Sequence, residues 1–205
     1  MSEFDEKQLE FQYSQRLKTY FLLGQVFQAA TVDALKKSDI DFDFVQMRVK
    51  SFPSFFEKAF RYHLTDPLTE IEDICGLRII HLFDNDLDKI KRVLKERFQE
   101  TKHVDKTLQN RDPASQKERQ FAYRSYHIYS KLKGGDLSKY PQLKDLVAEI
   151  QIRTICMHAW ASIEHRLNYK KQQDLPPEFR PIITRKFSQM SAMLEVADDL
   201  FMSLR

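Results

Sequence analysis

Residues 146–153, LVAEIQIR, alternate apolar and polar side chains and therefore predict a strand with one buried face. The apolar face of this strand carries Leu146, Ala148, Ile150 and Ile152. The opposite face carries Glu149, Gln151 and Arg153. An acidic side chain in the middle of an otherwise apolar strand is unusual unless it faces a site. The segment thus predicts a sheet with a packed core on one side and a functional surface on the other.

Three further segments, near residues 40–50, 76–83 and 121–133, also read as strands, and helical patterns separate them. A phase slip at Phe44–Val45 predicts a bulge in the first of these strands. Helices are predicted over 6–37, over 51–64 after a capping Ser51, over 84–98 and over 154–170, with a final apolar stripe from Phe187 to Leu204. The order of elements indicates an α/β fold with a mixed sheet (α+β).

The 205 residues fit one domain with an appendage. We expect a helical segment over 1–37, an α/β domain over 38–173 and a helical tail over 174–205. No apolar run is long enough for a membrane span, and the acidic start lacks a signal-peptide core. Cys75 and Cys156 are far apart and in no metal-binding spacing, which is typical of reduced thiols in a cytoplasmic protein.

The segment RVKSFPSFFEKAFR places several cations near one another. Arg48 and Lys50 are two apart on the polar face of a strand, while Ser54, Lys58 and Arg61 share one face of the following helix. A bound triphosphate needs such converging cations. The alternative is a solvated basic face.

The segment IEDICGLRII places Asp73 just before a strand and Arg78 within it. An Asp in this position can ligate Mg²⁺, and the Arg can contact a phosphate or stack on a base. The alternative is a helix- or strand-capping Asp with an arginine partner. Together with Glu149, Asp73 would bracket one metal ion.

The segment FAYRSYHIYSKL, residues 121–132, has hydrogen-bonding and aromatic groups on both faces of its predicted strand. One face carries Tyr123, Ser125, His127 and Tyr129, and the other carries Arg124, Tyr126 and Ile128. Basic residues surround this stretch, namely Lys102, Lys106, Arg111, Lys117, Arg119, Arg124, Lys131 and Lys133. They indicate either a solvated loop or an anion-binding surface.

Four stretches in this order, RVKSxxSxxEKxxR, DICGLRII, YRSYH and EIQIRTxxMHAWASIEHxLxYK, resemble the synthetase domain of the RelA/SpoT family in its short, single-domain form. The match covers about residues 44–171. The resemblance implies a nucleotidyltransferase-like fold with flanking N- and C-terminal helices. It also implies an ATP-dependent pyrophosphokinase, which transfers pyrophosphate from ATP to the 3′-hydroxyl of an acceptor nucleoside.

On the donor side, the resemblance implies a pocket for ATP and Mg²⁺. Arg48 and Arg78 match the arginines that sandwich the adenine. The group around the phosphates is matched by Lys50, Ser54, Lys58 and Arg61. Asp73 matches the Mg²⁺ ligand, and Glu149 matches the acid that helps to hold the metal and activates the attacking hydroxyl. The implied catalytic and metal-binding pair is therefore Asp73 and Glu149.

On the acceptor side, Tyr123 matches the tyrosine that stacks on the acceptor base, with His127 beside it, and Glu164 matches an acidic residue that contacts the base. One departure concerns the loop before Tyr123, where Ala122 follows Phe121 and the family usually has Gly. Two acceptors therefore stay open: GDP or GTP, giving (p)ppGpp, and the 3′ end of tRNA, the acceptor of toxic short members that a neighbouring antitoxin neutralises. A third reading is a catalytically inactive nucleotide-binding module.

The apolar stripe from Phe187 to Leu204 is expected to cover an apolar surface. That surface belongs to its own domain, to a second copy in a homo-oligomer, or to an antitoxin or other protein inhibitor.

Overall fold

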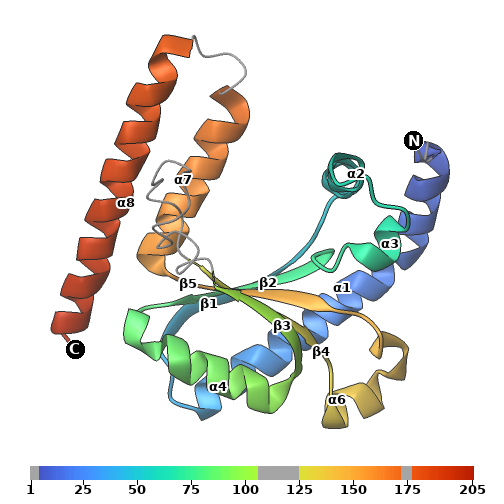
Figure 1. Ribbon diagram of the computed structural model, residues 1–205. Helices are drawn as coiled ribbons and strands as arrows, with labels where there is room; N and C mark the ends of the chain where they lie inside the picture. Colours follow the sequence, from blue (N-terminus) through green and yellow to red (C-terminus); the bar gives the residue numbers. More distant parts are fainter. Residues whose placement is uncertain (1–4, 106–124, 172–176) are drawn as a thin grey trace.

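The computed structural model describes residues 5–105, 125–171 and 177–205 (Figure 1). Within these residues one mixed sheet has the strand order β1-β2-β5-β4-β3. Its strands are β1 (Phe42–Val49), β2 (Cys75–His81), β3 (Gln99–Asp105), β4 (Tyr126–Lys131) and β5 (Ala148–Thr154). β2 and β5 are parallel, whereas β1–β2, β5–β4 and β4–β3 are antiparallel pairs. The predicted mixed α/β class is confirmed.

The helices lie on both sides of this sheet. They are α1 (Glu6–Lys37), α2 (Phe52–Arg61), α3 (Pro67–Glu70), α4 (Leu87–Arg97), α6 (Gly134–Lys139), α7 (Ile155–Lys171) and α8 (Arg180–Ser203). Short 3-10 turns occur at η1 (Asp84–Asp86), η2 (Pro141–Leu143) and η3 (Pro177–Phe179). In Figure 1, α1 and α4 cover one face of the sheet, while α2 and the antiparallel pair α7–α8 rise on the other side. No helix in the described ranges is both long and apolar enough to cross a membrane.

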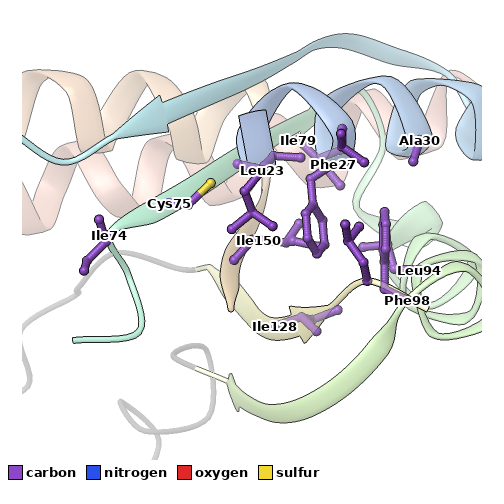
Figure 2. Packing of buried hydrophobic residues seen from close by; sticks show 14 of the residues in the cluster. Leu23, Phe27, Ala30, Ile74, Cys75, Ile79, Leu94, Phe98, Ile128 and Ile150 are labelled. Carbon is purple, nitrogen blue, oxygen red and sulfur yellow. The ribbon is translucent and has the colours of Figure 1, made fainter. Parts of the chain in front are cut away.

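The core lies between the sheet and helices α1 and α4 (Figure 2). Phe27 of α1 is fully buried and stacks on Phe98, with ring centroids 4.4 Å apart. A Cβ added at Gly24 would lie 2.8 Å from the Met47 sulfur, so the missing side chain lets α1 approach β1 closely. Gln28 also donates a hydrogen bond of 2.7 Å from Nε2 to the Val45 carbonyl oxygen. Close packing and a side-chain hydrogen bond therefore hold β1 against helix α1.

The strand alternation predicted from the sequence is confirmed on the core face. Ala148, Ile150 and Ile152 of β5 belong to the buried cluster, as do Tyr126 and Ile128 of β4. The helix expected over 6–37 has the bounds of α1. The bulge in β1 lies between Phe42 and Phe44, next to the predicted position.

The sequence pattern did not reveal β3, because QETKHVD is polar and all of its residues are exposed or half-buried. Such a strand lies at the edge of the sheet and has no apolar face to alternate. The strand expected over 121–133 is observed as β4, and residues 121–124 lie outside the described residues.

Some side chains of the apolar stripe of α8 pack against α7, and others are exposed. Phe187 meets Trp160 of α7 edge to face at 6.4 Å, and Thr154 Oγ1 donates a 2.8 Å hydrogen bond to Asp198. The exposed members of the stripe are Met193, Leu200, Phe201 and Leu204. Packing on the chain's own helices therefore accounts for only part of the stripe.

Phe27→Ala tests the role of α1 in the core. Removal of this fully buried ring should lower the free energy of unfolding by about 3–5 kcal/mol, because it loses apolar contact and leaves a cavity. Phe11→Ala is the matched control, since Phe11 lies on the same helix and is 64% exposed; its effect should stay within about 0.5 kcal/mol. Urea unfolding followed by circular dichroism measures the free energy of unfolding of both variants. Equal losses in the two variants would contradict the role of Phe27 in the core.

Candidate functional site

The sheet face opposite α1 carries polar side chains in cross-strand register. Arg48 faces Gly76, Gly76 faces Glu149, and Glu149 faces Tyr129 across β1, β2, β5 and β4. Because Gly76 has no side chain, a hollow remains in this row between Arg48 and Glu149. A pocket lies there, lined by Arg48, Lys50, Asp73, Gly76, Leu77, Arg78, Glu149 and Gln151. The fold thus gathers residues from three segments that are distant in the sequence.

Glu149 lies at the centre of a buried hydrogen-bond network. Its Oε1 accepts from His127 Nδ1 and from the Tyr129 hydroxyl, each at 2.8 Å, and its Oε2 accepts from Gln151 Nε2 at 2.8 Å. The other ring nitrogen of His127 lies 2.7 Å from Ser125 Oγ. Glu149 is only 7% exposed. The predicted outward face of β5 is therefore a buried polar layer, and not a solvated surface.

This network keeps Glu149 ionised. Burial by itself raises the pKa of Glu149, but the hydrogen bonds from His127, Gln151 and Tyr129 outweigh it and lower the pKa to about 2. Conversely, burial and the adjacent Glu149 charge raise the pKa of Tyr129 above its ordinary value, so the phenol keeps its proton. Glu149 is a fixed anion whose partners all donate to it.

Asp73 forms the second anionic point of the pocket. Its Oδ2 lies 3.2 Å from Lys50 Nζ and 2.9 Å from Lys58 Nζ. Its Oδ1 is buried, and no donor among the described residues reaches it. A buried acceptor that lacks a donor is a suitable ligand for a cation.

Arginines form the other wall of the pocket. Burial and then the charge of Arg48 lower the pKa of Arg78. On β5, burial and then the charge of Arg78 lower the pKa of Arg153 to about 9. Arg153 donates to Gln151 Oε1, so the Gln151 amide is oriented with its nitrogen toward Glu149.

The remaining predicted site residues lie elsewhere. Ser54 Oγ accepts from Ser51 Oγ at 3.1 Å, and the exposed Arg61 pairs with Glu57 on α2. Glu164 lies half-buried on α7 and is not among the residues lining the pocket. Tyr123 lies outside the described residues, so its predicted contact with a base is not visible here.

Two residues of the network, Tyr129 and Gln151, had no predicted role. Both could have been found from strand alternation, because Tyr129 is two residues after His127 and Gln151 is two residues after Glu149. His127 itself contacts Glu149 from a buried position instead of presenting its ring to the pocket.

The carboxylates of this pocket fit a Mg²⁺ ion that arrives with phosphates. Within the described ranges, no group of three or more His, Cys, Asp or Glu side chains is arranged to hold a metal. Mg²⁺ commonly takes one or two carboxylates and completes its coordination with substrate phosphates and water. Asp73 with its unpartnered Oδ1, together with the ionised Glu149, supplies such a set.

Comparisons with protein families and with curated proteins find similarity to RelA/SpoT proteins and to GTP pyrophosphokinases, respectively. Residues 47–174 match the family described as "Region found in RelA / SpoT proteins". The GTP pyrophosphokinases YjbM and YwaC of Bacillus subtilis (strain 168) are 35% identical over 161 residues and 31% identical over 162 residues. Each alignment covers 77% of this chain and 71% of the relative.

A solved structure extends the likeness to the whole fold. The small alarmone synthetase 1 from Bacillus subtilis, bound to its product pppGpp, superposes with a TM-score of 0.72 and is 30% identical. The superposition covers 95% of this chain and 96% of that chain, so it includes helices on both sides of the matched region.

The state of Glu149 can be tested through stability. Because folding lowers its pKa from 4.5 to about 2, ionised Glu149 stabilises the folded state above pH 4.5, and this contribution is lost as the pH falls toward 2. Glu149→Gln removes the titration but keeps the shape. The difference in free energy of unfolding between wild type and variant should therefore be largest at neutral pH and shrink through that window. Urea unfolding at a series of pH values measures this difference. A difference that does not change with pH would contradict the lowered pKa of Glu149.

Proposed function

Since this chain belongs to the RelA/SpoT family, we propose that it is an ATP-dependent pyrophosphokinase that transfers pyrophosphate to the 3′-hydroxyl of GDP or GTP and so makes (p)ppGpp. The observation that carries this proposal is the ionised Glu149, held by three donors in a pocket that also contains Arg48, Lys50 and Arg78. The two curated relatives named above are GTP pyrophosphokinases, which agrees with a guanine nucleotide as acceptor.

We assign the donor side of the pocket to ATP. Arg48 and Arg78, on neighbouring strands of one sheet face, would enclose the adenine ring by stacking. Cations for the phosphates would come from Lys50 and Lys58, with Ser54 and Arg61 of α2. Lys50 and Lys58 already contact Asp73, so they can divide their hydrogen bonds between this carboxylate and the phosphates.

Asp73 and Glu149 would hold Mg²⁺, which when bound spreads the charge that develops on the phosphates. In the reaction that we propose, the 3′-oxygen of the acceptor forms a bond to the β-phosphorus of ATP, and the bond from that phosphorus to the oxygen of the α-phosphate breaks, releasing AMP. Glu149 accepts a hydrogen bond from the attacking hydroxyl and takes up its proton as the new bond forms. The low pKa makes Glu149 a weak base, so its main contribution is orientation of the hydroxyl.

On the acceptor side, we propose that Tyr123 stacks on the base and that Glu164 contributes a hydrogen-bond acceptor to it. His127 acts through Glu149, since its ring lies buried between Glu149 and Ser125. The alternative tRNA acceptor has no support in the relatives reported above. Lys102, one of the basic residues that indicated an anion-binding surface, forms an ion pair with Glu72.

We place the enzyme in the cytosol, in agreement with its two free, buried cysteines. The exposed apolar side chains of α8 would be covered by a second copy of the chain.

A transfer assay tests the reaction and the acceptor together. With γ-³²P-ATP and Mg²⁺, label should enter GDP or GTP and not deacylated tRNA. Asp73→Asn and Glu149→Gln should each lower the rate by at least about 100-fold. Each substitution removes a carboxylate charge proposed to hold Mg²⁺ and keeps the shape of the side chain. Asp33→Asn is the matched control, since this exposed carboxylate forms an ion pair with Lys37, one turn further along α1. Near-normal turnover by either pocket variant, or labelled tRNA, would contradict the proposal.

The donor assignment makes a separate prediction for binding. Arg48→Ala and Arg78→Ala should each weaken the binding of ATP by about five- to tenfold, since one stacking arginine contributes about 1 kcal/mol. Lys37→Ala, on the exposed end of α1, should leave the affinity unchanged. Isothermal titration calorimetry with ATP and Mg²⁺ measures the three dissociation constants. Unchanged affinity for ATP in both arginine variants would contradict the proposal that Arg48 and Arg78 stack on the adenine.

A further inference from the structure

Tyr129 connects Glu149 to the edge of the sheet. Its hydroxyl donates a 2.8 Å hydrogen bond to Glu149 Oε1, and Lys102 Nζ lies over its ring, 4.4 Å from the centroid. Lys102 in turn forms an ion pair with Glu72, the residue directly before Asp73. A chain of contacts therefore runs from the Asp73 segment through Lys102 and Tyr129 to Glu149.

We propose that Lys102 and Tyr129 form a strap that fixes Glu149 relative to the Asp73 segment, which makes Tyr129 a positioning residue for the transfer step. This inference rests on the proposed function, because it concerns the geometry of the same carboxylates. The strap connects Glu72, which directly precedes Asp73, to Glu149 through Lys102 and Tyr129.

The register of β3 and β4 explains why the strap can form. Lys102 faces Tyr129 directly, after an irregularity between Glu100 and Lys102 that adds one residue to β3. The extra residue, Thr101, donates from Oγ1 to the Tyr129 carbonyl oxygen at 3.0 Å. The bulge thereby places Lys102 on the same sheet face as the pocket.

The strap also decides which oxygen of Glu149 faces the reactants. Each carboxylate oxygen offers two lone pairs. Oε1 uses both of them, one for His127 and one for Tyr129. Among the described residues Oε2 has only Gln151 as its donor, so Oε2 is the oxygen that faces the reactants. Without the Tyr129 hydroxyl, Oε1 would have a free lone pair and the carboxylate could rotate between two arrangements.

Tyr126 provides a matched control within the same strand. It also has a lysine over its ring, since Lys91 Nζ lies 4.4 Å from its centroid. It belongs to the core cluster on the opposite face of β4, and its hydroxyl has no role in the pocket network described above.

Tyr129→Phe tests the strap, because it removes the donated hydrogen bond and keeps the ring under Lys102. With ATP and GTP as substrates, kcat should fall about tenfold, the size expected for one hydrogen bond to a charged group, while KM for ATP stays within about twofold. Tyr126→Phe should leave both constants unchanged. Thermal unfolding of both variants should match wild type within a few degrees, since each loses a single hydroxyl.

Lys102 supplies a second, independent variant. Lys102→Met should lower kcat about threefold, since it removes the charge and keeps the stem, while Lys102→Arg should restore it. The double variant Lys102→Met with Tyr129→Phe should lose less than the product of the two single effects, because both act on one chain of contacts.

The outcomes separate this inference from the function on which it rests. A wild-type enzyme that labels no guanine nucleotide overturns the proposed function and the inference together. An active wild type with an unaffected Tyr129→Phe variant overturns the strap alone. Equal losses in Tyr126→Phe and Tyr129→Phe, or effects of Lys102 and Tyr129 that multiply independently, overturn it as well.

Discussion

An ionised carboxylate that is only 7% exposed must be stabilised by donors that the fold itself holds in place. For Glu149 these donors are His127 and Tyr129 on β4 and Gln151 on β5. Desolvation would otherwise favour the protonated form, and the pocket would lose its central charge. The antiparallel register of β4 and β5 is therefore an electrostatic requirement as well as a structural one.

Part of the positive charge of the pocket is compensated before any nucleotide binds. Asp73 forms ion pairs with both Lys50 and Lys58, so α2 and the segment before β2 are held together without phosphates. Arg78 lies beside Arg48; burial and then this like charge lower the pKa of Arg78, and the charge of Glu149 offsets only part of the effect. Under the proposed function, an adenine ring between the two guanidinium groups would relieve part of the cost of these like charges.

Much of this site follows from local patterns, and the rest depends on tertiary contacts. The alternation of residues 146–153 is enough to separate Ile150 from Glu149, and the spacing of Arg48 and Lys50 is enough to place them on one face. Strand β3 was not predicted, because its polar sequence is stabilised by pairing with β4 and not by an apolar face. The link between Lys102 and Tyr129 depends on a one-residue bulge, which has no signature in QETKHVD. Arg61 has the helical spacing of a phosphate ligand, yet its nearest anion is Glu57 on its own helix.

The parallel pairing of β2 with β5 also has a consequence for how the protein matures. Residue 75 pairs with residue 148, so the two carboxylates of the pocket meet only after a long loop has closed. Contacts of such high sequence separation form late in folding. During synthesis on the ribosome, α1, β1 and β2 emerge before β5 exists, and a nascent chain that already presents Asp73 and its lysines still lacks Glu149. Under the proposed function, the nascent chain would therefore gain its second pocket carboxylate only once β5 has been synthesised.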